Sequence, residues 1–393
     1  MDVSTTALSE LSEKLQEELV GWRRNLHENP ELSYQEEKTA QFVYETLESF
    51  GGLELSRPTA TSVMARLIGD EPGKTIAIRA DIDALPITEE NDFAFVSKNP
   101  GVMHACGHDG HTAILLGTTK ILASLKQQIK GEIRFLFQHG EEVGPGGAQE
   151  MVDAGVMDGV DKVIGLHLHS PLEVGNIAIT SGGTHAGSDT FTITVCGRGG
   201  HAAQPHDAVD SLAIAAQVVT NLQYIVARNV DPLDRLVISV TKVRGGTASN
   251  IIPGSVQMSG TTRSFNPELR NRLPQMMEQV IKGITEAHGA TYEFVYEYGN
   301  DPVINDPETT QLVKETLVEV FGSGAVQEMI PTMGGEDFSA FQRKAPGTYF
   351  WVGAGNVSKG IIHPHHHPQF TIDEDSLTIG VKAFTNLAFQ LLK

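Results

Sequence analysis

The sequence predicts an α/β fold in which a smaller α+β domain interrupts a larger domain built on a mostly parallel sheet. Its 393 residues suffice for two or three domains of about 150 residues each. Strand-like apolar runs alternate with helical segments toward both ends of the chain. From about residue 187 the order becomes strand, helix, strand, strand, helix, strand, which is typical of a ferredoxin-like domain.

The first part of the chain alternates helices and strands. Apolar residues recur at spacings of three and four from Leu8 to Trp22, which predicts one face of a helix. A second helix is expected from Gln35 to about Phe50, where Gly51 follows. Beyond it we expect strands at 62–68, 75–80, 132–137 and 163–166, and helices at 112–125 and 148–154.

The middle part of the chain has its own pattern. Here we expect strands at 190–196, 236–243, 256–263 and 292–298, and helices at 208–227 and 267–288. A helix at 307–321, a strand at 349–353 and a helix at 373–392 then resume the α/β alternation. We therefore predict one domain formed by residues 1–186 and 299–393, with residues 187–298 inserted as a second domain.

The charge and cysteine content exclude several classes of protein. Lys and Arg number 29 against 49 Asp and Glu, and the net charge of −20 disfavours nucleic acid or an anionic membrane as a partner. No apolar run is long enough for a transmembrane helix, and the N-terminal segment lacks the pattern of a secretion signal. Two cysteines, Cys106 and Cys196, form no disulfide framework. These features predict a cytoplasmic protein.

Histidines and acids gather where the expected strands end. In open α/β sheets, ligands bind beyond the carboxyl ends of the strands. Four segments of this kind are present: Asp81 and Asp83, then His139 with Glu141 and Glu142, then His167 and His169, and finally His363 to His367. We therefore expect these side chains to meet at one edge of the sheet.

The segment MHACGHDGH at 103–111 is the richest of these motifs. Cys106 and His108 are two residues apart, so in an extended loop both can face one side. In a reducing compartment, a thiol beside histidines is a metal ligand or a nucleophile with a histidine base. We favour the metal site because further histidines and carboxylates accumulate at the same edge. The remaining alternative is a loop of helix-capping residues around a small buried cysteine.

The adjacent acids Glu141 and Glu142 follow a strand and precede a glycine-rich turn. On an extended backbone successive side chains point in opposite directions, so one carboxylate can bind metal while the other faces substrate. A glutamate beside a metal-activated water is a common general base. Of Asp81 and Asp83, either can bind metal or orient a ligand histidine, and Asp81 can equally pair with Arg79 inside the fold.

The chemistry of these ligands points to a type of metal. His167 is expected to be a ligand, whereas the sequence does not choose among His363, His365, His366 and His367. Thiolate, imidazole and carboxylate together suit Zn²⁺, Mn²⁺, Co²⁺ or Ni²⁺ rather than Ca²⁺. Five ligands exceed one tetrahedral site, so we expect two divalent metal ions about 3.5–4 Å apart, which a thiolate can bridge.

These motifs resemble the aminoacylase/carboxypeptidase superfamily of dinuclear metallopeptidases. The segments RADIDALP at 79–86 and MHACGHD at 103–109 carry the resemblance first. More narrowly, the chain is similar to the bacterial N-acyl-L-amino-acid amidohydrolase branch, with hippurate hydrolases and plant auxin-conjugate hydrolases. Supporting blocks are WRRNLHENPELS at 22–33, GGHAAQP at 199–205, NIIP at 250–253, GTTR at 260–263 and GGEDF at 334–338.

The resemblance implies a role for each matching metal-site residue. Cys106 and His108 would bind metal, with the thiolate bridging two ions. Glu142 and His167 would be further ligands. In the His-His-Pro block, the ligand is the histidine two residues before the proline, which here is His366.

The resemblance also implies catalytic and substrate-binding residues. Glu141 would be the general base, Asp83 would orient the site, and His201 of a dimer partner would steady the oxyanion. Three further residues would hold the carboxylate end of the substrate: Asn250, Arg263 and the backbone of Gly335. The fold implied is a zinc-peptidase-like catalytic domain with a ferredoxin-like lid and dimerisation domain, in a homodimer or higher homo-oligomer.

The implied reaction is hydrolysis of an N-acyl amino acid to a carboxylate and a free amino acid, with Zn²⁺ or Mn²⁺ as the expected metals. Two departures from the branch pattern concern the pocket: Gln138-His139-Gly140 stands where Gln-Pro-Ala is usual, and extra histidines flank His366. Three alternatives remain open. They are a dipeptidase or carboxypeptidase acting on short peptides, a non-catalytic metal-binding protein and a cysteine hydrolase.

Overall fold

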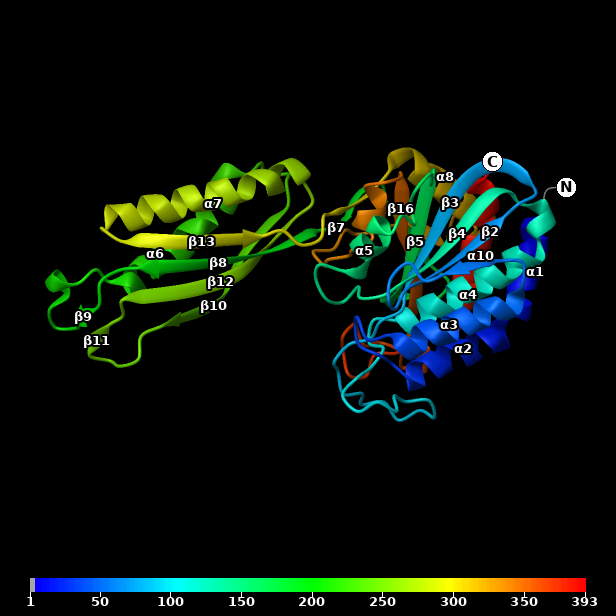
Figure 1. Ribbon diagram of the computed structural model, residues 1–393, viewed down its shortest axis with the longest axis horizontal. Helices are drawn as coiled ribbons and strands as arrows, with labels where there is room; N and C mark the ends of the chain where they lie inside the picture. The colour runs from blue at the N-terminus through cyan, green and yellow to red at the C-terminus, as the bar shows by residue number, and fades with distance from the viewer. Residues whose placement is uncertain (1–3) are drawn as a thin grey trace. The chain divides into compact units, whose positions relative to one another are not determined.

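The computed structural model describes residues 4–393, so the first three residues of the predicted first domain lie outside the described part. The chain divides into two compact units (Figure 1). The first comprises residues up to Thr184 together with 304–330 and 337–393, and the second comprises residues 185–303 and 331–336. Within residues 4–393, no helix combines the length and the apolar character that crossing a bilayer requires.

An eight-stranded mixed sheet forms the centre of the first unit. From edge to edge its strands are β1 (Glu54–Ser56), β2 (Val63–Ile68), β4 (Lys130–Gln138), β3 (Glu71–Asp81), β5 (Lys162–Glu173), β16 (Gly347–Gly355), β6 (Ile177–Ile179) and β15 (Val326–Glu328). The four central strands β4, β3, β5 and β16 run parallel, whereas β1 and β2 pair antiparallel on one side and β6 pairs antiparallel with β16 on the other. The predicted α/β class is thereby confirmed.

Helices cover the sheet of the first unit. They are α1 (Thr5–Lys14), α2 (Gln16–Glu28), α3 (Glu37–Phe50), α4 (His108–Ser124), α5 (Gly147–Asp153), α8 (Pro307–Phe321), α9 (Ser339–Gln342) and α10 (Asp375–Leu391). Helix α4 packs against α2, α3 and α10 as well as against β3. Fully buried aromatic rings join the layers, for example Phe350 of β16, which meets Phe384 of α10 edge-on at 6.1 Å.

The single helix that we expected near the N-terminus is two helices. Leu15 lies between α1 and α2, and its backbone N–H bonds to the carbonyl oxygen of Ser12 at 3.2 Å. This tight turn separates the helices, and both still bury leucines, Leu8 in α1 and Leu19 in α2. The prediction was therefore wrong in the number of helices and right about the buried face.

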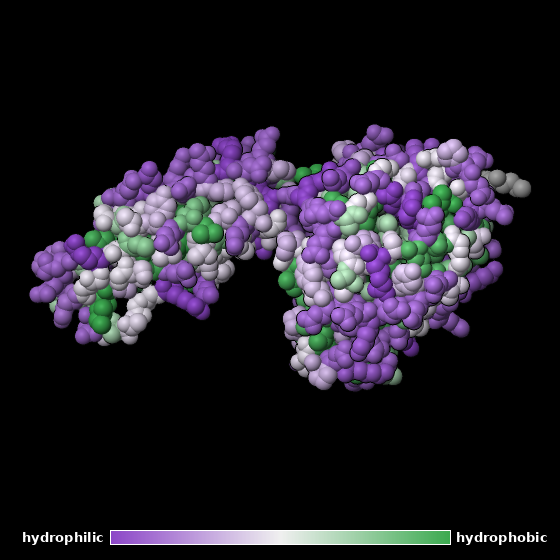
Figure 2. Space-filling view, viewed as in Figure 1, coloured by the Kyte–Doolittle hydropathy of each residue, from purple (hydrophilic) through white to green (hydrophobic). Residues whose placement is uncertain are grey.

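The second unit is an α+β structure with a core of its own. Its antiparallel sheet has the order β10 (Leu236–Gly245), β12 (Ser255–Ser264), β8 (Gly187–Cys196) and β13 (Thr291–Glu297). Helices α6 (Ser211–Tyr224) and α7 (Pro267–Ala287) enclose an apolar cluster with these strands. The chain order of these six elements is that of a ferredoxin-like arrangement. In Figure 2, hydrophobic surface is visible near the end formed by β9 (Gly200–His201) and β11 (Ile251–Ile252), where Ile251 is 51% exposed.

Shorter elements complete the described part of the chain. They are β7 (Gly182–His185), which pairs with β14 (Val303–Asn305), three 3₁₀ turns (Lys126–Gln128, Pro205–Asp207, Val357–Lys359) and a π-helical turn (Ile225–Asn229).

The parallel register aligns the ends of the central strands. Asp81 at the end of β3 is the partner of Gln138 at the end of β4, and His167 of β5 is the partner of Trp351 of β16. The segments that follow β3 and β4 therefore begin side by side. The acids and histidines that the sequence places after these strands reach the same edge of the sheet, as open α/β folds require of a binding site.

Candidate metal centre

The five residues proposed as metal ligands lie together at this edge of the first unit. Their donor atoms form overlapping groups in which all atoms lie within 4.8 Å of one another: Cys106 with His108 and His167, Cys106 with Glu142 and His366, and His108 with Glu141 and Glu142. These side chains come from four separate segments of the chain. The convergence that the sequence pattern predicts is present in the structure.

The start of helix α4 presents Cys106 and His108. Gly107 between them has a left-handed φ of +93°, and a Cβ atom there would lie 3.6–3.7 Å from Phe370, His111 and Leu168. Glycine adopts this conformation without the strain that other residues suffer. The sharp turn at Gly107 therefore lets the thiol and the imidazole approach the same neighbours.

His108 is oriented with one nitrogen toward the protein and the other toward the centre. Its Nδ1 atom lies 3.0 Å from the carbonyl oxygen of Asp83 and 3.2 Å from the Oδ1 atom of that residue. Its Nε2 atom is buried without a hydrogen-bond partner, 3.8 Å from the Oε1 atom of Glu142, which also lacks one. Metal-binding histidines characteristically donate the second ring N–H in this way.

His167 has the same arrangement. Its Nδ1 atom donates to the carbonyl oxygen of Leu168 at 2.8 Å, and Nε2 lies 3.4 Å from the sulfur of Cys106. Burial and the neighbouring rings of His111 and His365 hold the pKa of His167 well below its usual range, which leaves a neutral ring with a lone pair available.

The histidine-rich tract brings two rings to the centre. Nε2 of His366 lies 3.4 Å from Oε1 of Glu142, although the side chain remains 53% exposed. Nδ1 of His365 lies 4.0 Å from the sulfur of Cys106, but His365 belongs to none of the donor groups described above. His366 has a left-handed φ of +64°, which is uncommon outside glycine. The donor geometry therefore favours His366, the ligand that the resemblance implies.

The electrostatics of this cluster suit a cation. Burial of the His108 ring opposes its protonation, but the carboxylates of Asp81, Asp83 and Glu142 outweigh burial and raise the pKa of His108 to about 10. Burial, followed by the charges of Glu142 and Glu141, raises the pKa of the Cys106 thiol well above its usual value. A thiolate nucleophile paired with a histidine needs the opposite shift. The buried ligand atoms that lack hydrogen-bond partners and the accumulation of carboxylates together fit a bound metal ion.

The two aspartates after β3 have different surroundings. Asp81 is buried, with Oδ2 2.7 Å from Arg79 and Oδ1 2.6 Å from Nδ1 of His111. The pairing with Arg79, one of the alternatives that the sequence left open, is therefore present. Asp83 instead contacts His108 and accepts the backbone N–H of Glu142 at 3.0 Å. Asp83 therefore links the two parts of the candidate centre, and Asp81 links the centre to the core.

The expectation that Glu141 and Glu142 point in opposite directions is wrong. The two residues stand in a turn between β4 and α5 rather than on extended backbone, and both carboxylates lie within 4.8 Å of the same histidine nitrogen. Two carboxylates hold this turn, because Glu36 accepts the N–H of Gly140 at 2.8 Å and Asp83 accepts that of Glu142. One acid still lies nearer the buried donors, since only Glu142 also joins the group with Cys106 and His366.

Sequence reasoning missed three residues that support the site. Ser33 donates to Oδ2 of Asp83 at 2.7 Å, Glu36 accepts the N–H groups of Tyr34 and Gly140, and His111 bonds to Asp81. A spacing of three residues places His111 on the same helical face as His108, which is a signal that could have been used. No comparable signal marks Ser33 or Glu36.

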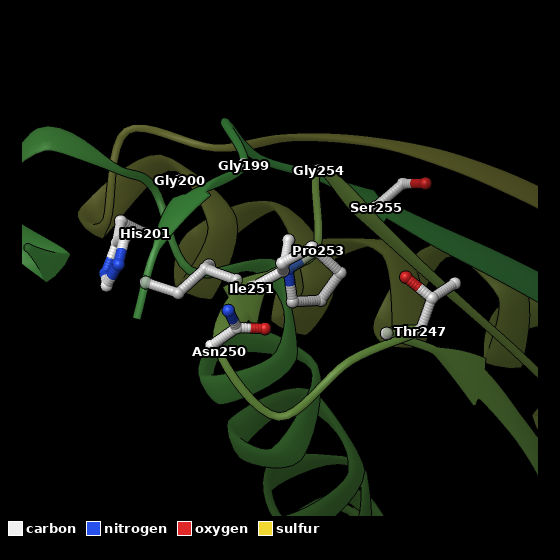
Figure 3. A pocket seen from close by; sticks show the side chains of 11 residues that line it. Gly199, Gly200, His201, Thr247, Asn250, Ile251, Pro253, Gly254 and Ser255 are labelled. Carbon is white, nitrogen blue, oxygen red and sulfur yellow. The ribbon is translucent and has the colours of Figure 1, made fainter. Parts of the chain in front are cut away.

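The four remaining predicted residues belong to the second unit. His201 pairs with Ile251 across β9 and β11, and His201 and Asn250 line one cavity of about 670 Å³ (Figure 3). Arg263 lies opposite Ser188 at the other end of the sheet, and a Cβ atom on Gly335 would lie 3.6 Å from the Cβ atom of Ser188. Within one chain, Asn250 therefore lies near His201, whereas Arg263 lies near Gly335.

The fold and the donor set together are typical of metal-dependent hydrolases. The sequence profile of peptidase family M20/M25/M40 matches residues 77–390. The chain belongs to this family and is a hydrolase.

Individual relatives agree with this assignment. An N-acyl-L-amino acid amidohydrolase of Geobacillus stearothermophilus is 64% identical over 301 residues, which are 77% of this chain and 81% of the relative. A crystal structure of an aminohydrolase from methicillin-resistant Staphylococcus aureus has a TM-score of 0.94 at 35% identity, covering 99% of this chain and 100% of that one. A dinuclear metal-binding peptidase of the M20 family from Bacillus subtilis has a TM-score of 0.86 at 36% identity, covering 97% and 99%.

Proposed function

We propose that this protein hydrolyses N-acyl amino acids, such as N-acetyl or N-benzoyl compounds, to a carboxylate and a free amino acid. The observation that carries the proposal is the convergence of a thiol, three imidazoles and a paired carboxylate, whose donor atoms form overlapping groups of three that each lie within 4.8 Å of one another. The name of the Geobacillus relative supports the substrate class.

Two divalent ions would be held by the proposed ligands, which are Cys106, His108, Glu142, His167 and His366. Zn²⁺ and Mn²⁺ suit this mixture of sulfur, nitrogen and oxygen donors, and Co²⁺ and Ni²⁺ are compatible with it. When bound, such ions lower the pKa of water and polarise a carbonyl group. The similarity to the dinuclear metal-binding peptidase of Bacillus subtilis supports the number of ions.

Glu141 is proposed as the general base. Its carboxylate lies within 4.8 Å of the donor atoms of His108 and Glu142, so a water molecule placed among them is within its reach. Glu141 would take a proton from the attacking water and return it to the leaving amine. Asp83 would keep His108 in the tautomer whose Nε2 atom faces the centre.

The second unit, which contains the whole of the predicted domain at 187–298, is proposed to supply groups that bind the substrate. Arg263, beside Gly335, suits a substrate carboxylate because the planar guanidinium bonds to both oxygens. His201 and Asn250 lie at the other end of β8 and β12, some eight residues along the strand from Arg263, or about 25 Å. A small substrate cannot touch both ends of this sheet within one chain. A homodimer in which His201 and Asn250 act on the substrate of the partner subunit would give a role both to these residues and to Arg263.

The proposed domain roles follow from this division. Residues 1–186 and 299–393 would form the catalytic domain, and residues 187–298 would serve as lid and dimerisation domain. A cytoplasmic location suits a ligand set that includes a free thiol, because thiols remain reduced there.

The test combines metal analysis with a panel of substrates. Purified protein is expected to contain about two equivalents of a divalent transition metal and to hydrolyse N-acetyl and N-benzoyl amino acids. Chelation should abolish the activity, and Zn²⁺ or Mn²⁺ should restore it. Faster turnover of dipeptides than of every acyl amino acid would favour the peptidase alternative. Activity that survives chelation but not thiol alkylation would contradict the metal site.

A further inference from the structure

His111 uses both ring nitrogens inside the protein. Nδ1 lies 2.6 Å from Oδ1 of Asp81, and Nε2 accepts the backbone N–H of Leu168 at 2.8 Å. A backbone N–H can only donate, so the lone pair is on Nε2 and the proton on Nδ1. The donor atoms of His111 lie within 4.8 Å of those of Asp81 and His108, yet this bonding leaves His111 no lone pair for a cation. It is a neighbour of the centre rather than a ligand.

The partner of His111 is part of the segment that carries His167. The peptide groups of Leu168 are held from two directions, because His111 accepts its N–H and the Nδ1 atom of His167 donates to its carbonyl oxygen. The pairing of β5 with β3 extends only to Gly165, which lies opposite Arg79. His111 therefore continues the hydrogen bonding of β5 beyond its last pair with β3.

His111 also stands between two of the proposed ligands. Its ring centre is 5.4 Å from that of His108 and 4.6 Å from that of His167, which it meets nearly edge-on. His111 lies three residues after His108 on helix α4, and it is 1% exposed. Its anchor Asp81 is in turn held by Arg79 at 2.7 Å. The ring is therefore a rigid spacer between α4 and β5.

We infer that His111 is a positioning residue that sets the separation between the ligands on α4, Cys106 and His108, and the ligand on β5, His167. The route of this effect is the hydrogen bond from the Leu168 N–H to Nε2. The inference rests on the proposed function, since it assigns His111 a role toward the metal ions that those ligands would hold. It predicts that metal affinity depends on an acceptor at the position of Nε2.

Two substitutions separate the two hydrogen bonds of His111. In His111→Asn the shorter amide can still donate to Asp81, but it leaves the Leu168 N–H without an acceptor. In His111→Gln the longer side chain reaches the position of Nε2, where its oxygen can accept that N–H. His288→Asn is the matched control, because His288 is an exposed histidine of the second unit that bonds to Gln217.

The measurement is titration of the metal-free full chain with Zn²⁺ alone, in competition with a chromophoric chelator. For His111→Asn we expect one equivalent to bind about 10- to 100-fold more weakly, the usual effect of losing a group that orients a ligand. His111→Gln should regain most of this loss, and His288→Asn should match the wild type. Thermal unfolding of each variant checks that it is folded.

Three results would overturn the inference. One is a folded His111→Asn variant that binds both equivalents as tightly as the wild type. Another is equal loss of affinity in the Asn and Gln variants, because the effect would then not pass through Leu168. The third applies if the Asn variant does not fold: weakened Zn²⁺ binding by a folded His111→Gln variant would then contradict the inference. Failure of the proposed function looks different, because the wild-type chain would itself bind no Zn²⁺ and the role of His111 would fall with it.

Discussion

The Oδ1 atom of Asp83 lies 3.2 Å from the Nδ1 atom of His108, and this contact orients the imidazole. The other carboxylate oxygen accepts the hydroxyl of Ser33 at 2.7 Å and the backbone N–H of Glu142 at 3.0 Å. Although burial opposes ionisation, His108 in the first place, and then the N–H of Glu142 and the hydroxyl of Ser33, hold the pKa of Asp83 below its usual range. One ionised side chain therefore fixes both a proposed ligand and the turn that carries the acid pair.

Replacing Asp83 by Asn tests this link. The amide keeps the shape of the side chain but loses the charge that holds His108 in place. We expect metal affinity to fall about 10- to 100-fold, with a parallel loss of activity at limiting metal. Zn²⁺ titration of the metal-free variant measures the effect, and Asp153→Asn on the exposed surface of α5 is the control. Unchanged affinity in Asp83→Asn would show that the ring of His108 is held by its other contacts.

Replacing Glu141 by Gln separates proton transfer from metal binding. Glutamine occupies the same space but cannot accept the proton of the attacking water. We expect kcat to fall by a factor of about 10² to 10⁴ while metal content stays at the wild-type level. Steady-state kinetics and metal analysis of the same preparation give both quantities, and Glu315→Gln on the exposed face of α8 is the control. Near-normal kcat in Glu141→Gln would remove Glu141 from the role of base.

The sequence was most informative where residue chemistry and strand order coincide. Asp83, Glu142 and His167 could be expected to meet because parallel strands deliver their carboxyl ends to one edge of a sheet. That rule needs only the order of the elements and the residue types that follow them. The pairing of Asp81 with Arg79 was one of three alternatives that the sequence offered for Asp81, and the structure contains that contact.

The sequence was least informative where turns and distant contacts decide the geometry. The direction of Glu141 depends on a turn whose backbone is held by Glu36, a residue about one hundred positions away. Likewise, motifs alone grouped Asn250 with Arg263, although the antiparallel register of β8 and β12 separates them within one chain. Neither constraint can be predicted from local sequence patterns, because both depend on residues that are distant along the chain.

Gly140 is predicted to be required for the position of the acid pair. Its φ of +63° is left-handed, and a Cβ atom there would lie 3.0–3.2 Å from the ring of Tyr34. We expect Gly140→Ala to destabilise the protein by about 1–2 kcal/mol, and to lower kcat because the turn bearing Glu141 must shift.

Urea unfolding and steady-state kinetics measure the two effects of Gly140→Ala. Gly283 provides a matched control because it lies inside helix α7, where an added Cβ atom would meet nothing within 4 Å. Gly283→Ala should stabilise the protein by about 0.5–1 kcal/mol, since alanine favours helices over glycine. Equal responses of stability and kcat at the two positions would contradict the proposed constraint at Gly140.

The stability of the first unit is predicted to depend on pH through His27. This buried ring bonds to Asp109 at 2.7 Å and to Glu89 at 3.1 Å, with Arg23 alongside. Burial and the charge of Arg23 oppose its protonation, but the two carboxylates outweigh them and raise the pKa of His27 above its usual value of 6.5. The folded protein therefore binds a proton that the unfolded chain releases as pH rises past 6.5.

The sign of the pH effect follows from this difference. Below pH 6.5 both states hold the proton and the stabilisation is fully present, and it is lost as pH rises toward the higher pKa of the folded state. The advantage in unfolding free energy of the wild type over His27→Gln should thus shrink above pH 6.5, by at most about 1.4 kcal/mol per pH unit. Urea unfolding of both proteins between about pH 6 and 9 measures this difference and cancels titrations that they share. A difference that stayed constant or grew with pH would mean that His27 is buried in its neutral form, with Asp109 neutralised by Arg23 alone.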